Sequence, residues 1–277
     1  MDATVIDTLQ SVRTTLNYLV RTDQKPYSYT FEPPPGVPPR YGQVDAVAGV
    51  AVRDARPLAD QLSLDEQGFV LRPHPTAVAD FYDEEQLKAV YYPEVEALLK
   101  AETGSDKVVI FDHTIRSVPK FNAGVPNMRE PVRRVHNDYT ATSGIRRVRD
   151  HLSPEEAEQR LARRFLEVNV WRPIAGPLQD APLALCDART IAADDLIASD
   201  LIYRDKVGET YALSYSPAHR WFYFPKLRRD EAVLIKCFDS DLTSPGRFTA
   251  HTAFDDPTTP ADALPRESIE IRALVFL

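Results

Sequence analysis

Short apolar runs separated by turn residues dominate the second half of the chain, which is the pattern of a protein built mainly from strands. The runs are rich in β-branched and aromatic residues, which favour strands over helices. We expect strands at residues 165–173, 182–191, 210–217, 221–227, 232–239, 248–254 and 268–276. A succession of this kind is typical of a double-sheet jelly-roll, also called a double-stranded β-helix.

The first 105 residues have a mixed texture and predict a helical and extended buttress for the strand-rich part. Residues 4–20 predict an amphipathic helix, because apolar side chains recur there at helical spacing. These apolar positions are Val5, Leu9, Val12, Leu16 and Leu19. Residues 26–39 are rich in proline and aromatic residues, which favours an extended arm. Residues 83–103 predict a second helix, which Pro93 should kink or split into two.

Two more strands and one more helix are predicted between these parts. Residues 68–73 and 107–115 have strand character. The segment Ser153-Pro154-Glu155-Glu156 is a capping box with proline at the first helical position, so a helix should run from there to about Arg164. We therefore expect one domain over residues 1–277, mainly β within the α+β class. Its buttress would occupy residues 1–105 and its cupin-like jelly-roll core residues 106–277.

Composition narrows the range of partners and compartments. The net charge of −8 and the pI near 5.3 argue against a nucleic-acid-binding protein, which would need clustered Lys and Arg. No apolar run is long enough to span a bilayer, and the first residues carry an acid where a signal peptide would carry a base. Cys186 and Cys237 lie inside apolar runs and are expected to be buried thiols. These features favour a cytoplasmic protein without a membrane partner, and they leave a homodimer open.

The candidate chemistry starts at His136-Asn137-Asp138. On a strand, His136 and Asp138 project to the same face, because side chains alternate with a period of two. Two histidines and one carboxylate form the facial triad of non-haem Fe(II) oxygenases. The motif alone is equally compatible with a surface histidine beside an aspartate in a loop. The residues around it must therefore decide between a metal site and such a loop.

Two histidines could supply the third metal ligand. His251 lies on the penultimate expected strand, and in a jelly-roll this strand closes against the one that opens with H-x-D. His219 lies two strands earlier and is the alternative ligand. We therefore predict a metal site at His136, Asp138 and His251. The remaining histidines have no convincing partner in this strand order.

The last expected strand carries two arginines that could bind an anionic cosubstrate. Arg266, Ser268, Glu270 and Arg272 are evenly spaced, so their side chains share one face. A carboxylate is bound best by a fixed guanidinium, and the hydroxyl of Ser268 would be a second donor. A salt-bridged barrel face is the competing interpretation for whichever arginine is not used.

Taken in order, these motifs resemble those of the Fe(II)/2-oxoglutarate-dependent oxygenases. More narrowly, the chain resembles the fungal and bacterial tailoring family of gibberellin-desaturase-like, CmcJ-like and NvfI-like oxygenases. The resemblance covers about residues 110–277. It rests on VHNDYT (135–140), NVWRPIAGPLQDAPLALCDART (169–190), HRWFYFP (219–225), DEAVLIKCFDS (230–240), HTAFDDP (251–257) and PRESIEIRALVF (265–276).

The resemblance implies a jelly-roll with iron at His136, Asp138 and His251, and with 2-oxoglutarate bound through Arg266 or Arg272. Arg266 lies fifteen positions after His251, a longer gap than is usual in the wider superfamily, which leaves open which arginine binds the cosubstrate. The substrate pocket is expected to draw on aromatic and polar side chains near the iron. The candidates are Tyr139, Trp171, Arg172, His219 and Trp221.

The function implied is an oxidoreductase that hydroxylates, desaturates or otherwise oxidises a small molecule of secondary metabolism. It would consume O2 and convert 2-oxoglutarate to succinate. Two alternatives remain at this point. One is a cupin-type metal dioxygenase or oxidase that does not use 2-oxoglutarate, and the other is a non-catalytic jelly-roll binding module.

Overall fold

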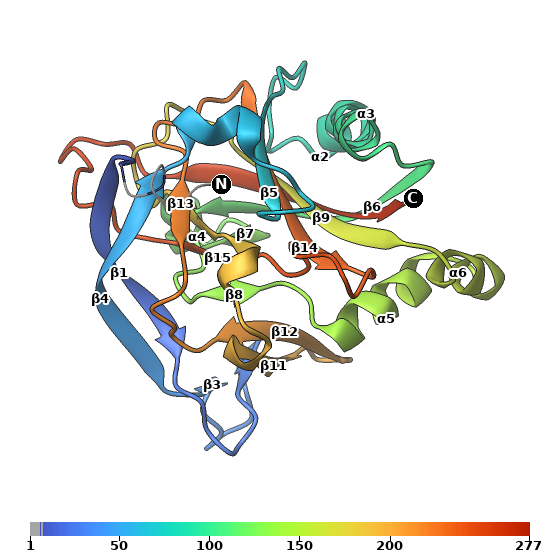
Figure 1. The fold of residues 1–277 in the computed structure, drawn as a ribbon, viewed down its shortest axis with the longest axis horizontal. Helices are drawn as coiled ribbons and strands as arrows, with labels where there is room; N and C mark the ends of the chain where they lie inside the picture. The colour runs from blue at the N-terminus through green and yellow to red at the C-terminus, as the bar shows by residue number, and fades with distance from the viewer. Residues whose placement is uncertain (1–5, 7) are drawn as a thin grey trace.

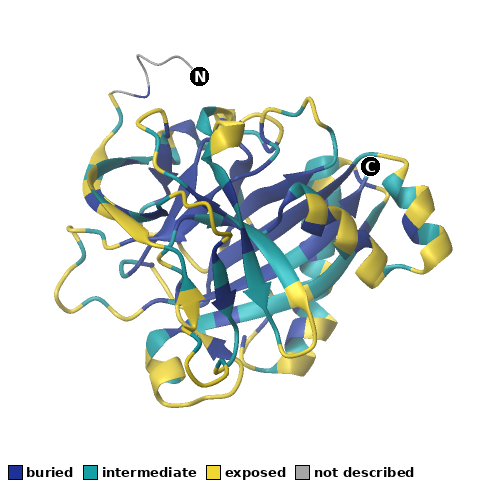
Figure 2. Cartoon of the chain, turned by 90° about the horizontal axis from the view of Figure 1, so that it is seen from below, coloured by how far each residue is buried: buried dark blue, intermediate teal, exposed yellow. Residues whose placement is uncertain are grey.

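Two mixed β-sheets pack against each other around one main apolar core (Figure 1). The computed structural model describes residue 6 and residues 8–277. Strands supply most of the regular structure, and helices are few, so the prediction of a mainly β fold is confirmed. Buried residues lie along the strands, and exposed residues lie on the outer helices and connecting loops (Figure 2).

The six-stranded sheet contains the most deeply buried strands. Its order is β5 (Phe69–Pro73), β14 (Glu231–Asp239), β9 (Phe165–Pro173), β16 (Glu267–Phe276), β6 (Lys107–Ser117) and β7 (Met128–Arg129). Every residue of β9 and β14 is buried, which explains why these strands read as nearly continuous apolar runs in the sequence. The predicted strands at 68–73, 107–115, 165–173, 232–239 and 268–276 are all present.

The ten-stranded sheet combines strands from both halves of the chain. Its order is β1 (Ser11–Leu19), β4 (Val44–Asp54), β13 (Trp221–Tyr223), β10 (Leu183–Cys186), β15 (His251–Ala253), β8 (His136–Asn137), β12 (Val207–Leu213), β11 (Leu196–Ile202), β2 (Tyr27–Tyr29) and β3 (Arg40–Tyr41). The strands predicted at 182–191, 221–227 and 248–254 are present but shorter. The long strand β4 and the strand β11 were not predicted.

The predicted N-terminal helix is wrong from Ser11 onward, although Ile6 is helical. Residues from Ser11 onward form β1, which pairs antiparallel with β4. Thr14, Leu16 and Tyr18 are buried in alternation, because the strand turns one face inward. Residues 4, 5 and 7 of the predicted helix lie outside the described residues. Pairing with β4 therefore outweighs the helical spacing of the apolar residues.

The other predicted helices are present. The helix expected at 83–103 consists of α2 (Glu84–Gln86), a π-helical turn (Leu87–Tyr91) and α3 (Tyr92–Thr103). Pro93 lies in the first turn of α3, just after the break that it was expected to cause. The helix α6 (Pro154–Leu161) begins after Ser153, whose hydroxyl accepts a hydrogen bond from the Glu156 amide. The helix α5 (Ala141–His151) was not predicted.

Two smaller expectations also concern the fold. Cys186 and Cys237 are both buried and unbonded, as predicted. None of the helices in the described part of the chain is long and apolar enough to cross a membrane.

Candidate active site

Two histidines that are far apart in the sequence lie side by side on neighbouring strands. His136 on β8 is paired directly with His251 on β15, and their ring centroids are 4.5 Å apart. Asp138 follows β8, and its Oδ1 lies 3.4 Å from His136 Nε2 and 3.9 Å from His251 Nε2. One ligand atom from each of the three residues falls within 4.8 Å of the others, so together they could hold one metal ion.

Backbone carbonyls fix which nitrogen of each histidine faces this point. His136 Nδ1 lies 2.8 Å from the carbonyl oxygen of Arg134, and His251 Nδ1 lies 3.1 Å from that of Thr249. A carbonyl can only accept, so each Nδ1 carries a proton and donates it. Each Nε2 is thereby left with a lone pair directed toward Asp138, which is the arrangement that a metal-binding histidine needs.

The two carboxylate oxygens of Asp138 also have different surroundings, one bound by the protein and one facing the histidines. Its Oδ2 accepts a hydrogen bond from Asn169 Nδ2 at 2.8 Å and one from Arg272 Nε at 3.2 Å. These two donors come from β9 and β16 of the opposite sheet, where Asn169 and Arg272 are paired. Oδ1 is the oxygen that faces the two histidines, so it is free for a metal ion.

The protonation states also suit metal binding. Burial and the neighbouring His136 lower the pKa of His251 to about 4, so this histidine is neutral at physiological pH. Burial of Asp138 opposes its ionisation, but the positive charge of Arg272 holds the pKa of Asp138 well below its usual range. A neutral imidazole and an ionised carboxylate are the forms that bind metals.

A small cavity adjoins the two histidines and contains a buried arginine. Trp171, Arg266, Arg116 and Glu270 line it together with His136 and His251. Arg266 is only 3% exposed, donates through Nε to Ser268 Oγ at 3.0 Å and through Nη1 to the Ala181 carbonyl at 2.8 Å. Its Nη2 has no hydrogen-bond partner among the described residues, and no carboxylate there forms an ion pair with it.

Burial of this guanidinium destabilises its charged form, which lowers its pKa. Loss of solvent, with a smaller contribution from Arg116, lowers the pKa of Arg266 to about 9, so the group is still charged at neutral pH. A buried charge without an ion-pair partner favours an anion that can supply one. The ring of Trp171 lies 4.9 Å from the guanidinium carbon and stabilises the cation only in part.

Arg272, the other candidate for the cosubstrate, is already fully engaged. Besides Asp138 it contacts Asp112 at 2.9 Å, the Thr114 hydroxyl at 2.9 Å, and Glu270. Every nitrogen of its guanidinium therefore has an acceptor from the protein. The geometry makes Arg272 a support for Asp138 and leaves Arg266 as the arginine with a free donor.

Comparison with known proteins agrees with this geometry. Residues 16–276 match a family model described as "Oxidoreductase/YMDC permease-like domain". The chain is 37% identical over 252 residues to the Fe(II)/2-oxoglutarate-dependent dioxygenase nvfI of Aspergillus novofumigatus, covering 87% of this chain and 89% of the relative. It is 33% identical over 288 residues to the hydroxylase/desaturase poxK of Penicillium oxalicum, covering 91% and 87%. The solved structure of the iron and alpha-ketoglutarate-dependent endoperoxidase NvfI superposes with a TM-score of 0.85 at 32% identity, covering 96% of this chain and 98% of that one.

The chain belongs to the NvfI-like family of Fe(II)/2-oxoglutarate-dependent oxygenases. The resemblance inferred from the ordered motifs is thereby confirmed, and so is the jelly-roll fold. Members of this family are oxidoreductases that depend on Fe(II) and 2-oxoglutarate. Neither the cupin-type enzyme without 2-oxoglutarate nor the non-catalytic module fits this membership.

Of the five residues predicted for the substrate pocket of this oxygenase, only Trp171 lines the cavity. Arg172 follows Trp171 on β9 and therefore points to the opposite face, where it binds the His74 carbonyl and stacks over Phe81 and Tyr91. Tyr139 is buried, and its carbonyl accepts a hydrogen bond from the Asn137 side chain.

His219 and Trp221 lie in a separate hydrogen-bonded cluster. His219 Nδ1 lies 3.2 Å from the Tyr18 hydroxyl, and its Nε2 lies 3.1 Å from Asp195 Oδ2. Trp221 Nε1 donates to the same Tyr18 hydroxyl at 2.8 Å. Both ring nitrogens of His219 are thus occupied, and the three-residue group around Asp138 does not include it.

Several oxygenase residues near the site were not assigned from the sequence. Asn169 lies two positions before Trp171 on β9, so alternation from Trp171 could have placed it on the inner face. Glu270 belongs to the salt-bridged face that was the competing interpretation, and its Oε1 accepts from Arg116 Nη2 at 3.1 Å. Glu167 is fully buried, and neither carboxylate oxygen has a described partner. Burial raises the pKa of Glu167 well above its usual range and so favours its protonated form.

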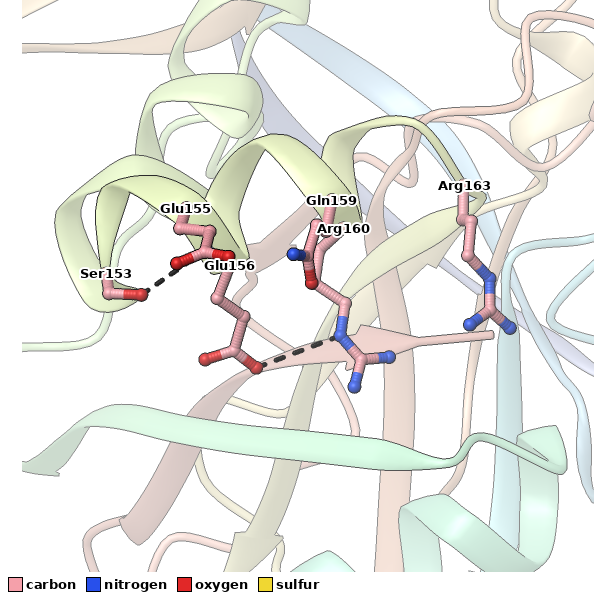
Figure 3. Close-up of a pocket in the computed structure, with 6 residues that line it drawn as sticks. All are labelled: Ser153, Glu155, Glu156, Gln159, Arg160 and Arg163. Atoms are coloured by element: carbon pink, nitrogen blue, oxygen red, sulfur yellow. Dashed lines mark hydrogen bonds and ion pairs between the residues drawn. The ribbon is translucent and has the colours of Figure 1, made fainter.

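A second hollow differs from the cavity beside the two histidines in the residues that line it. It runs along α6 and is lined by Ser153, Glu155, Glu156, Gln159, Arg160 and Arg163 (Figure 3). Arg160 Nε and Glu156 Oε1 are 3.9 Å apart across it. The hollow contains none of the predicted site residues, and its charges neutralise one another on an exposed helix.

Proposed function

We propose that His136, Asp138 and His251 bind Fe(II) through Nε2, Oδ1 and Nε2. Arg266, supported by Ser268, then binds the distal carboxylate of 2-oxoglutarate in the adjoining cavity. One observation supports this proposal above the others. The two histidines and the buried, unpaired guanidinium of Arg266 line the same cavity.

The protein's own contribution is binding and orientation. When bound, Fe(II), 2-oxoglutarate and O2 together supply an oxidant that can remove hydrogen from an unactivated carbon, with succinate and carbon dioxide as co-products. His136, Asp138 and His251 would hold the metal, and three protein ligands would leave it able to bind cosubstrate and O2. Asn169 and Arg272 hold Asp138 in one orientation, and Arg266 fixes the direction in which the cosubstrate enters.

The substrate is a small molecule, and we propose that it is secondary-metabolite-like. Relatives carry the names hydroxylase/desaturase and endoperoxidase. One kind of iron centre serves all of these outcomes, so the pose of the substrate decides between hydroxylation, desaturation and ring closure. We further propose that residues 1–277 form one oxygenase domain that acts in the cytoplasm without nucleic acid or a membrane, and that a homodimer is compatible with this activity.

Anaerobic titration of metal-free protein tests the assignment. Fe(II) followed by 2-oxoglutarate should produce the weak metal-to-ligand charge-transfer band of an iron-bound 2-oxo acid in the visible spectrum. Iron binding without the band would instead favour a metal oxidase that does not use 2-oxoglutarate. An intact fold that binds no iron would favour a binding module.

Two histidine variants distinguish the ligand from its alternative. His251→Ala should abolish iron binding, whereas His219→Ala should retain iron and the charge-transfer band, because Tyr18 and Asp195 occupy both of its nitrogens. Loss of the band in His219→Ala, with the band retained in His251→Ala, would overturn the assignment. Circular dichroism on both variants checks that the fold is intact.

A further inference from the structure

Two further arginines, Arg134 and Arg40, have no carboxylate partner among the described residues and lie on the face of the ten-stranded sheet that carries His136. Arg134 is two residues before His136, and its backbone forms a bridge to Asn17 of β1. Val135, between them, is buried in the cluster that contains Tyr18 and Trp221. Because side chains alternate along an extended segment, Arg134 and His136 both project to the face opposite Val135.

Arg40 reaches this face from the far end of the same sheet. Paired residues on neighbouring strands share a face, and a series of register pairs connects the two ends. The pairs are His136–Ala212, Gly208–Leu201, Leu201–Ser28 and Ser28–Arg40. Ala212 and Gly208 are four positions apart on β12, so they also share a face. The strands β12, β11 and β3 at the end of this series lie together along the lower edge of Figure 1.

The sheet curls so that the two ends of the series meet. In sheet order β12 and β11 separate β8 from β2, yet Arg134 Nη2 lies 3.5 Å from the hydroxyl of Ser28 on β2. The contact crosses the concave side of the sheet, because both side chains project there. Arg134, Ser28 and Arg40 therefore gather on the concave face that also carries His136.

The charges of this group are not balanced by the protein. No described carboxylate forms an ion pair with Arg134 or Arg40, whereas the neighbouring Arg133 is paired with Asp255. Arg40 is paired with Ser28, and Arg134 contacts the hydroxyl of Ser28, so the two guanidinium groups lie on the same side of the sheet and repel each other. An anion between them would remove this repulsion and gain charge-assisted hydrogen bonds.

We propose that Arg134 and Arg40, together with the Ser28 hydroxyl, bind a carboxylate of the substrate. The proposal rests on the proposed function, since it is the iron at His136 that gives this face its chemistry. It narrows the substrate class to small carboxylic acids. Two guanidinium groups and a hydroxyl match the donor requirements of one carboxylate.

The rest of the molecule makes such a subsite necessary for an acidic substrate. The chain carries a net charge of −8, which repels anions unless cations gather locally. The position of the subsite is also fixed relative to the iron ligands, because the Arg134 carbonyl accepts the hydrogen bond from His136 Nδ1. A carboxylate held here would orient the rest of the substrate relative to the open side of the metal.

Calorimetric titration of the loaded enzyme tests the proposal. The enzyme is first saturated with Mn(II) and 2-oxoglutarate, so that the metal site and Arg266 are occupied and no turnover takes place. Benzoate, 1-naphthylacetate and cholate are then titrated, each against its neutral primary amide. We expect at least one acid to bind at least tenfold more tightly than its amide. If no acid is preferred over its amide, the proposal is wrong.

Variants then locate the preference. Arg134→Gln should remove the preference for the acid without changing the affinity for the amide, and Arg40→Gln should reduce it less, because Arg40 is more exposed. Arg163→Gln, on the surface hollow beside α6, is the matched control and should leave the preference unchanged (Figure 3). An acid preference that survives in Arg134→Gln would contradict the proposal.

Failure of the proposed function would be recognised separately. Each variant is checked first for Mn(II) and 2-oxoglutarate binding and for its melting temperature. A wild-type protein that fails to bind these two ligands would contradict the metal and cosubstrate assignment. A variant that binds both and melts normally, but has lost the acid preference, supports the subsite alone.

Discussion

The surroundings of Arg266 and Arg272 show two opposite ways of placing an arginine inside a protein. Arg272, in β16, is surrounded by acceptors from Asp138, Asp112 and Glu270. Arg266, immediately before the same strand, has only a hydroxyl and a backbone carbonyl, and no carboxylate pairs with it among the described residues. The satisfied arginine stabilises the protein, and the unsatisfied one is available to a ligand. A buried arginine that the fold leaves unpaired is therefore a candidate for binding an anionic ligand.

The largest expected effect is on stability, at the satisfied arginine. Arg272→Leu leaves the carboxylates of Asp138, Glu270 and Asp112 without their shared cation, and we expect a loss of about 3 kcal/mol in the free energy of unfolding. Urea denaturation monitored by circular dichroism measures this loss. Arg272→Lys should lose less free energy of unfolding, because lysine keeps the positive charge but not the forked set of donors of a guanidinium. A stability unchanged in Arg272→Leu would mean that the network contributes little.

The unsatisfied arginine should behave in the opposite way. Arg266→Gln removes a buried, unpaired cation, so the free energy of unfolding should stay within about 1 kcal/mol of wild type. Affinity for 2-oxoglutarate should fall by about 100-fold, since a charge-assisted pair is lost. Titration of the Fe(II) form under argon, with the charge-transfer band as the signal, gives this ratio. An equal loss of affinity for 2-oxoglutarate in Arg272→Lys would contradict the different roles given to the two arginines.

Glu167 extends the comparison to a buried acid without a partner. Its pKa is higher in the folded than in the unfolded chain, so the folded state holds more protons and stability falls as pH rises above the usual pKa of a glutamate. Glu167→Gln removes this titration, and the variant should gain on wild type by up to about 1.4 kcal/mol per pH unit above pH 4.3 until the raised folded pKa is reached. Urea midpoints between pH 4 and pH 9 give both curves. Parallel curves would show that folding does not raise the pKa of Glu167.

The smallest expected effect concerns the ring beside Arg266. Trp171→Phe keeps an aromatic face near the guanidinium but weakens the cation–π contact, which is worth about 0.5–2 kcal/mol in full. The affinity for 2-oxoglutarate should therefore change by less than about tenfold. The same titration measures it, with Trp221→Phe as the control outside the cavity. A larger loss than that of Arg266→Gln would make the ring, and not the charge, the main determinant.

Much of the candidate site followed from strand periodicity. Alternation placed His136 and Asp138 on one face, and the strand order of a jelly-roll selected His251 over His219. The structure brings the first three together and places His219 against Tyr18 and Asp195. These inferences needed only the period of a strand and the order of strands.

The choice between the two arginines could not be made in this way. Arg266 and Arg272 share a face by their spacing, but their partners come from other strands. Asp112 is brought to Arg272 by the pairing of β6 with β16, and Asp138 reaches it from the opposite sheet. Whether an arginine is satisfied depends on such tertiary pairing, which a single sequence does not encode locally.

The prediction of a helix in the N-terminal segment was wrong for a related reason. The apolar residues from Leu9 to Leu19 fit helical spacing, but Thr14, Leu16 and Tyr18 also fit a strand. The unpredicted strand β4 lies beside them and decides in favour of the strand. A short amphipathic segment is ambiguous until its partner is known.

The most direct test of the central claim is a crystal structure of the protein with Mn(II) and 2-oxoglutarate bound. We expect the metal on Nε2 of His136, Nε2 of His251 and Oδ1 of Asp138. The distal carboxylate of 2-oxoglutarate should lie on Arg266, with Arg272 still paired to Asp138. A carboxylate bound to Arg272, or a metal held by His219 in place of His251, would contradict this claim.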